Sequence, residues 1–167
     1  TMRDGSGHGH DGTLKNIKEV TAVSVEGNGQ NIADNETTPS ASDDTDFGSV
    51  TQNGSTMTRT FTVRNTGTAA LTTSGLTVPT GFTVTGGLSA SIAAGGSDTF
   101  TVRLDSAVLG TKTGDISFAN NDSDENPFNF RITGVVVATP VPEIVVEGNG
   151  QNIADNDTTP SASDHTD

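Results

Sequence analysis

Side chains that carry oxygen gather in two short segments of the sequence. The first, residues 26–46, is rich in Asp and contains no Lys or Arg. The second, residues 122–126, has the alternating Asp-x-Asp-x-Asn spacing with which many calcium loops begin. Calcium takes carboxylate and carbonyl oxygens, and a carboxylate cluster without a counter-charge repels itself. The predicted calcium ligands are Asp34, Glu36, Asp43, Asp46, Asp122, Asp124 and Asn126.

The pattern is not that of an EF-hand, because no Glu follows residues 122–126 at the distance of the last ligand. Asp and Asn in loops also accept hydrogen bonds from their own backbone, so solvated turns are the alternative interpretation. In a sandwich, the loop after the first strand and the loop before the last strand are expected at opposite poles. We therefore expect the acidic segment of one repeat to face residues 120–126 of the next, with calcium at the joint.

Catalytic and transition-metal chemistry find little support in the sequence. His8, His10 and Asp11 could bind a transition metal, but the glycines between them leave the ligands without a fixed geometry, which favours a linker. The remaining histidine, His165, stands alone, and no G-x-S-x-G motif is present. We expect a protein that is not an enzyme.

Composition excludes several other classes. The net charge of −13, from 8 Lys+Arg against 21 Asp+Glu, argues against nucleic acid as a partner. No apolar run approaches the roughly 20 residues of a membrane helix, so we expect no membrane insertion in this segment. The absence of Cys excludes disulfides, and the absence of Trp and Tyr argues against a glycan-binding platform as the main role.

A long internal repeat organises the chain. Residues 25–46 read VEGNGQNIADNETTPSASDDTD, and residues 146–167 read VEGNGQNIADNDTTPSASDHTD, so 20 of 22 positions match at an offset of 121 residues. Self-similarity at a fixed period indicates a tandem array, and this period fits a whole β-sandwich with an insertion. We interpret residues 1–19 as a linker, 20–138 as a complete repeat, 139–142 as a Pro-containing linker and 143–167 as the opening of the next repeat.

Alternating apolar residues between the two copies predict short β-strands. Met57–Arg64 and Thr99–Leu104 alternate most clearly, and Gly, Asn and Pro separate the runs. The chain is therefore expected to be all-β, an antiparallel sandwich of two sheets. The predicted core consists of Phe61, Val63, Val78, Phe82, Phe100, Val102, Leu104, Ile116, Phe118, Phe128, Phe130 and Ile132.

Three stretches resemble a known family. NIADNETTPSASDDTDFGSV, TRTFTVRNTGTAAL and ISFANNDSDENPFNFRITG are similar to the choice-of-anchor D domain of bacterial surface proteins. The resemblance covers about residues 20–138 and implies an immunoglobulin-like sandwich related to major-sperm-protein-like and abnormal-spindle/hydin-type domains. It also implies a large, secreted, multi-repeat parent held at the cell surface, and it brings no catalytic residues.

These observations favour a structural repeat of an extracellular or cell-surface protein, acting as a stalk, adhesin scaffold or filament subunit. The alternative is an adhesion module that recognises a glycan or a protein through its pole loops. The expected partners are neighbouring repeats or copies of the chain itself. Residues 143–167 contain a first strand with no sandwich to join, and an unpaired strand is a template for pairing with another chain.

Overall fold

The computed structural model describes residues 21–159 and 161–163. This part of the chain consists of strands and loops, and it contains no helix that could cross a membrane. It divides into two compact units, of which the first ends at Val137 and the second begins at Ala138. The predicted all-β class is confirmed, whereas the predicted linker 1–19 and the histidines lie outside the described residues.

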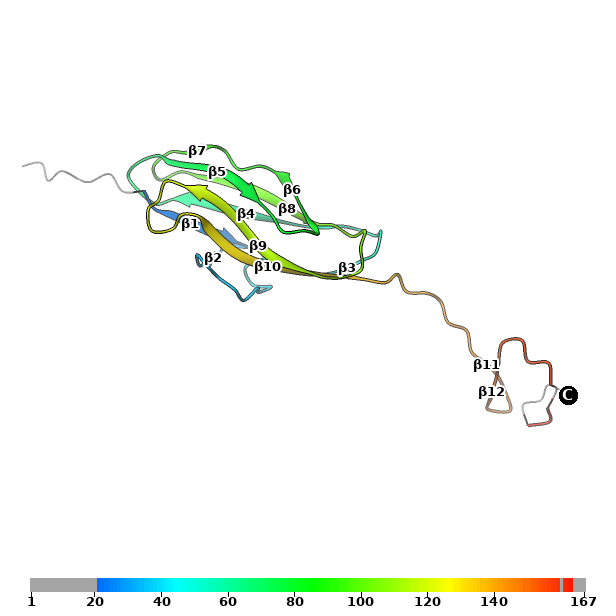
Figure 1. Ribbon diagram of the computed structural model, residues 1–167. Helices are drawn as coiled ribbons and strands as arrows, with labels where there is room; N and C mark the ends of the chain where they lie inside the picture. Colours follow the sequence, from blue (N-terminus) through cyan, green and yellow to red (C-terminus); the bar gives the residue numbers. More distant parts are fainter. Residues whose placement is uncertain (1–20, 160, 164–167) are drawn as a thin grey trace, which may run out of the picture. The chain divides into compact units, whose positions relative to one another are not determined.

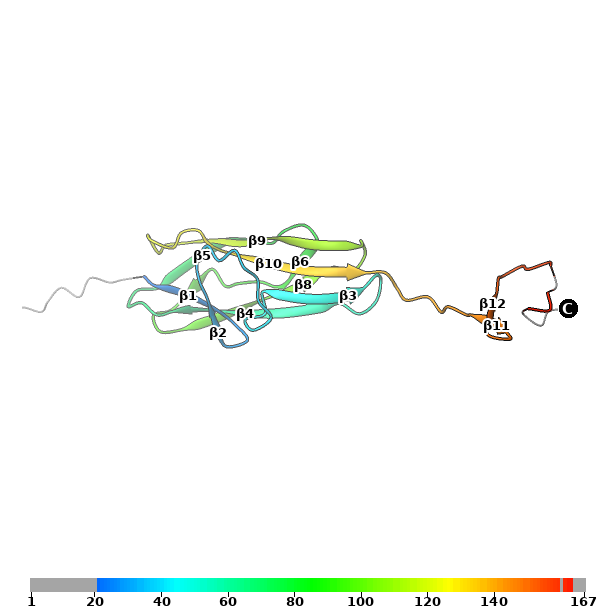
Figure 2. The same cartoon turned by 90° about the horizontal axis from the view of Figure 1, so that it is seen from below.

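The first unit is a sandwich of two five-stranded sheets (Figures 1 and 2). One sheet has the order β2 (Gln30–Ile32), β1 (Val23–Gly27), β4 (Met57–Asn65), β8 (Ser97–Leu104) and β6 (Phe82–Gly86). The other has the order β3 (Asp46–Thr51), β10 (Phe128–Val137), β9 (Gly110–Asn120), β5 (Leu71–Thr77) and β7 (Ser91–Ile92). Neighbouring strands are antiparallel except for β3 and β10, which are parallel and so depart from the all-antiparallel prediction.

The apolar positions of the alternating strands form one core between the sheets. All seven Phe are buried, and the ring of Phe61 lies 5.3 Å from that of Phe100 in its own sheet and 5.2 Å from that of Phe130 in the other. Eleven of the twelve predicted core residues are buried. The exception is Val78, which follows β5 in a loop before Pro79 and is only partly buried against the core.

The Asn28-Gly29 pair reverses the chain directly after β1. Asn28 has a φ of 49° and Gly29 a φ of 72°, and two central residues with positive φ make the type I′ turn that matches the twist of a hairpin. In the resulting hairpin, Val25 is opposite Ile32. The segment after β2 therefore runs back towards the pole at which β1 begins.

The chain enters and leaves the sandwich at opposite poles (Figures 1 and 2). At the first pole, the backbone N–H of Val23 donates to a carboxylate oxygen of Asp122, in the loop before β10. From there β10 runs the length of the sheet to Val137, where the N–H of Gln52 donates to its carbonyl.

The second unit contains a hairpin of β11 (Val146–Gly148) and β12 (Gln151–Ile153). Val146 is opposite Ile153, as Val25 is opposite Ile32 in the first copy. Asn149 and Gly150 have φ values of 52° and 72°, so the turn is also the same. The repeated sequence thus forms the same local structure twice.

Candidate functional site

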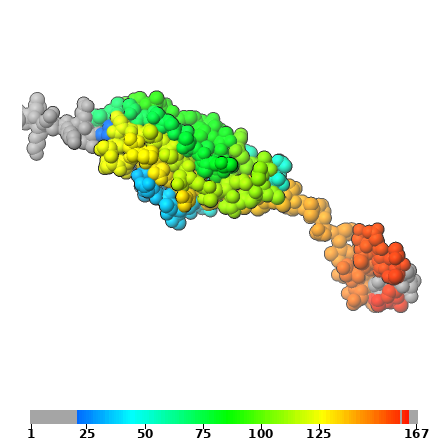
Figure 3. Space-filling view, viewed as in Figure 1, coloured from blue at the N-terminus to red at the C-terminus, as the bar shows by residue number. Residues whose placement is uncertain are grey.

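The acidic segment returns to the pole where the domain begins and lies along β10 of its own domain. The N–H of Asn35 donates to the carbonyl of Asn129 at 2.7 Å, and Glu36 forms a parallel bridge with Phe130. In Figure 3 this light-blue segment lies beside the yellow loop and strand. The prediction that it lies at the opposite pole, facing the next repeat, is therefore wrong for residues 34–36, because the hairpin turn reverses the chain.

Four carboxylates come together at this pole. Asp34 accepts a hydrogen bond from the N–H of Asn129 at 2.8 Å, which places it next to the loop that carries Asp122, Asp124 and Glu125. Asp122 is 3% exposed and accepts the N–H of Val23 at 3.0 Å. Three predicted ligands are thus neighbours, and Glu125 joins them.

The surroundings disfavour the charged forms of two of these groups. Burial, followed by a hydrogen bond with Asp124, raises the pKa of Asp122. Partial burial, together with repulsion from Asp122, Asp34 and Asp124, raises the pKa of Glu125. The folded state therefore binds protons at this pole more tightly than the unfolded chain does.

We expect Glu125→Gln to stabilise the domain at pH 7. A carboxyl whose pKa is raised by folding contributes stability below its ordinary pKa of about 4.5, and this stability is lost as the pH rises through the raised pKa. The variant should melt about 1–3 °C above the wild-type chain at pH 7, and the difference should vanish near pH 4. Thermal melts from pH 4 to 8 would measure this.

The matched control for this variant is Glu143→Gln, which removes the same charge from an exposed position of the second unit. Its melting temperature should follow that of the wild-type chain at every pH. A Glu125→Gln variant that behaved like this control would contradict the repulsion inferred at the pole.

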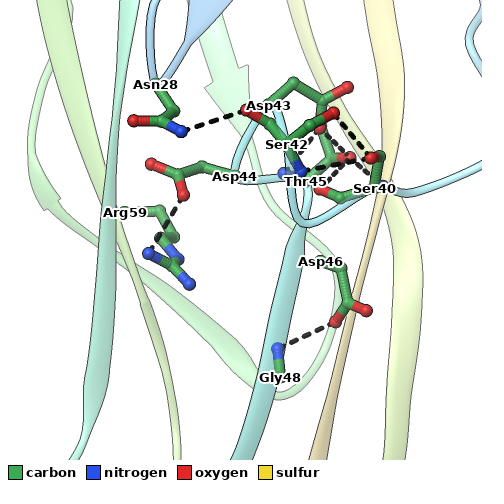
Figure 4. Close-up of polar contacts among 9 residues, drawn as sticks. All are labelled: Asn28, Ser40, Ser42, Asp43, Asp44, Thr45, Asp46, Gly48 and Arg59. Atoms are coloured by element: carbon green, nitrogen blue, oxygen red, sulfur yellow. Dashed lines mark hydrogen bonds and ion pairs between the residues drawn. The ribbon is translucent and has the colours of Figure 1, made fainter.

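Asp43 belongs to a separate, buried polar network (Figure 4). One of its carboxylate oxygens accepts from the Thr45 hydroxyl at 2.6 Å and from the Thr45 N–H at 3.1 Å. The Thr45 hydroxyl also accepts the N–H of Ser40 at 2.7 Å. Because Asp43 is 6% exposed and Thr45 is fully buried, this carboxylate closes a turn within the protein.

The other acidic side chains of the segment also have partners within the protein. Asp44 forms an ion pair with Arg59 at 3.0 Å, and Asp46 accepts the N–H of Gly48 at 2.8 Å (Figure 4). Glu36 accepts the N–H of Ala33 at 3.2 Å. The bonds of Asp46 and Glu36 are of the backbone-capping kind that the sequence left open as the alternative to calcium.

Asn126, the last predicted ligand, lies in the loop of the acidic pole. Its side-chain oxygen accepts the N–H of Asn120 at 3.1 Å, and the amide of Asn120 donates to the carbonyl of Glu125. Among residues 21–159 and 161–163, no three His, Asp or Glu side chains are placed to hold a metal ion together.

Comparisons with known proteins bear on the family. The HYDIN/CFA65/VesB-like Ig-like domain family matches residues 40–134. A protein of unknown function from Porphyromonas gingivalis W83 matches in structure with a TM-score of 0.53 and 17% identity, over 70% of this chain and 47% of that chain. The present chain thus spans about half the length of that protein.

Two further structural matches have lower TM-scores. PapD-like domain 7 of human CEP192 matches with a TM-score of 0.45 and 13% identity, over 55% of this chain and 82% of that chain. The Vibrio cholerae VesB protease matches with a TM-score of 0.40 and 17% identity, over 65% of this chain and 31% of that chain. No curated protein matches the sequence.

The family match covers more than half of the chain and falls on the sandwich, from the polar turn at Ser40 to Gly134 in β10. The two-sheet architecture and the buried Phe cluster agree with an immunoglobulin-like fold. The chain belongs to the family of HYDIN/CFA65/VesB-like Ig-like domains.

Proposed function

We propose that the chain is a non-enzymatic structural repeat of an extracellular bacterial surface protein of the choice-of-anchor D type, in which the sandwich acts as a spacer. The observation that carries this proposal is the placement of the two ends of the sandwich at opposite poles (Figures 1 and 2). A domain with this arrangement lengthens an array each time it is repeated.

The second copy of the acidic segment supports a tandem array. Its hairpin has the strand register and positive-φ turn of the first copy, although the two copies lie 121 residues apart. Residues that build the start of one sandwich are therefore ready to build the start of another. The net charge of −13 keeps such copies soluble and mutually repelling, which suits a protein that projects from a surface.

Small-angle X-ray scattering tests the spacer role. Arrays of one, two and three 121-residue units should increase in maximum dimension by a constant amount, about 40 Å per unit, since a ten-residue strand alone spans about 33 Å. An array whose maximum dimension barely increases with each added unit would contradict the proposal.

Calcium remains a prediction for the pole formed by Asp34, Asp122, Asp124 and Glu125, whose carboxylates would have to move closer together, because no three of them are placed to hold a metal ion in the described structure. A divalent cation there would relieve the repulsion that raises the pKa of Glu125. Because extracellular modules bind calcium with a Kd of ~10⁻⁴–10⁻³ M, we expect the melting temperature to rise by several degrees at millimolar calcium and to fall back with chelator. Equal melting curves in calcium and in chelator would contradict calcium binding at this pole.

A hollow at the pole where β10 ends favours the adhesion module as a second candidate. It has a volume of about 310 Å³ and lies beside Val108, which is 65% exposed. Its lining residues are Thr80, Gly81, Asp105, Ala107, Val108 and Lys112. A binding module should give saturable binding to glycans or cell surfaces that Val108→Asp weakens, whereas a spacer should give none.

A further inference from the structure

The sandwich exposes large apolar side chains at one place, the pole where β10 ends. Val108, Leu109 and Val137 are 65%, 47% and 42% exposed, and no other large apolar side chain of residues 21–137 is exposed. Leu109 precedes β9 and Val137 ends β10, and these two strand ends are paired. Exposed apolar side chains that gather in this way mark interaction sites more often than single ones do.

The hollow beside Val108 has a fixed wall. It is lined by the loop between β5 and β6, the loop between β8 and β9, and the start of β9. The side-chain amide of Gln52 donates to the carbonyl of Ala107 at 3.0 Å. The N–H of the next residue, Asn53, donates to the carbonyl of Ser106 at 3.0 Å. The turn after β3 thus holds the β8–β9 loop in place, and a preformed hollow costs a ligand less binding energy than one that must first be ordered.

Lys112 gives this hollow a positive charge that has no ion-pair partner among the described residues. The other described cationic side chains are arginines, and each of them forms an ion pair, whereas the Lys112 ammonium donates to the carbonyl of Leu109 at 3.1 Å. Asp105 also lines the hollow. Its two carboxylate oxygens accept from Arg103 at 2.8 Å and from the Thr83 hydroxyl at 2.7 Å. On a chain of net charge −13, the hollow therefore attracts a carboxylate.

The start of β9 also carries backbone groups that no strand pairs with. β5 lies beside β9 only from Ser117 onwards, so the first half of that edge has no neighbouring strand. The N–H of Thr133 in β10 points away from β9, to the carbonyl of Thr45. Its opposite residue, Thr113, therefore also points its N–H and C=O away from β10, as does Thr111. Among the described residues, these groups have no backbone hydrogen-bond partner.

The loop between β5 and β6 limits this open edge but leaves its backbone groups unpaired. A Cβ at Gly114 would lie 2.5 Å from the side chain of Pro79. A Cβ at Gly81 would lie 2.7 Å from the side chain of Lys112. Lys112 and Gly114 belong to the face of β9 that continues into the buried Ile116, so both contacts lie on the inner face. The loop thus forms the floor of the hollow, and the edge is open as far as Gly114.

We propose that an extended segment of a partner protein binds here. It adds a short strand to β9 at Thr111 and Thr113, with an aliphatic side chain against Val108 and a carboxylate beside Lys112. The inference rests on the adhesion module, the second candidate function, and names its class of partner. Backbone N–H and C=O groups that recur about every 7 Å along a strand match the backbone of an extended polypeptide, which favours a protein over a glycan. The net charge of −13 disfavours a second copy of the chain as the partner.

Amide hydrogen exchange followed by NMR, with a synthetic peptide added to the full chain, tests the proposal. The peptide has threonine at every second position and valine, glutamate and valine between the threonines. In the free chain, the amides of Thr111 and Thr113 should exchange quickly, whereas that of Lys112, which faces β10, should exchange slowly. At a peptide concentration of about five times Kd, exchange at Thr111 and Thr113 should slow about sixfold, because only the free fraction exchanges.

Matched controls separate backbone pairing from adventitious contact. Thr113→Pro removes one N–H of the open edge and leaves the bonds to β10, whereas Thr113→Ala keeps this N–H, so only the first variant should lose peptide binding. On the wild-type chain, a peptide N-methylated at the residues that face β9 should not bind, and this arm decides the matter should Thr113→Pro fail to fold. Lys112→Gln should weaken binding of the glutamate peptide about two- to fivefold and leave binding of the same peptide with glutamine unchanged.

Protected amides of Thr111 and Thr113 in the free chain would overturn the proposal, because the edge would then already be covered. Exchange rates that millimolar peptide does not change, or equal binding of the plain and the N-methylated peptide, would also overturn it. Saturable glycan binding that Val108→Asp weakens, without any effect of the peptide, would keep the adhesion module and exclude the protein partner inferred for it.

Discussion

The Gly27→Ala variant is expected to melt about 10 °C below the wild-type chain. A Cβ at Gly27 would lie 1.8 Å from the carbonyl oxygen of Asp43 and 3.2 Å from the ring of Phe61. The first contact is with backbone, so the acidic segment has to move off the sheet, and with it the buried hydrogen bonds of Asp43 to Thr45. A loss of about 3 kcal/mol follows from overpacking and unsatisfied buried groups, and thermal melting measures it.

Gly148 provides the control, because it has the same sequence neighbours in the second copy. Gly148→Ala should change the melting temperature of the sandwich by less than about 2 °C, since its hairpin belongs to the other compact unit. A Gly27→Ala variant as stable as Gly148→Ala would mean that the acidic segment does not cross the sheet at Gly27.

Phe61→Ala should remove about 3–5 kcal/mol of unfolding free energy. The ring of Phe61 is fully buried. It packs against Phe100 of its own sheet and against Phe130 of the opposite sheet, so it connects the two sheets. Because single domains are stable by about 5–15 kcal/mol, this loss is a large part of the total. Urea unfolding followed by far-UV circular dichroism would give the difference.

Thr62→Ala is the matched control for this core variant. Thr62 is the next residue of β4 and points to the outer face, where its partner is Glu26. Its replacement should cost no more than about 1 kcal/mol of strand preference. Similar losses for Phe61→Ala and Thr62→Ala would contradict the assignment of the two faces of β4.

The sequence predicted the strands whose apolar residues alternate strictly, such as β4 and β8, because a side-chain period of two follows directly from strand geometry. It missed β3, in which the buried residues Phe47 and Val50 are three apart. Gly48, with a φ of 69°, and a register shift of β10 between Thr133 and Val135 interrupt the alternation there. A strand irregularity of this kind is fixed by its partner strand and leaves no periodic signal.

The acidic pole shows a similar limit. The Asn28-Gly29 pair is a turn signal in the sequence itself, but the parallel contact of Glu36 with Phe130 joins residues that lie far apart in the sequence. Only this contact brings Asp34 beside the loop with Asp122 and Glu125. The sequence thus predicted most of the carboxylates of the pole, and the tertiary fold decided which of them became neighbours.

The β1–β2 hairpin is packed within the sandwich, whereas Val146 in β11 is 50% exposed, although 20 of the 22 residues of the two copies are the same. Amide hydrogen exchange at low micromolar concentration measures this difference in cover, because it compares both hairpins in the same molecule. We predict that the amides of β1 and β2 exchange as slowly as the core of the sandwich, while those of β11 and β12 exchange within seconds to minutes. Equal protection of the two hairpins would contradict it.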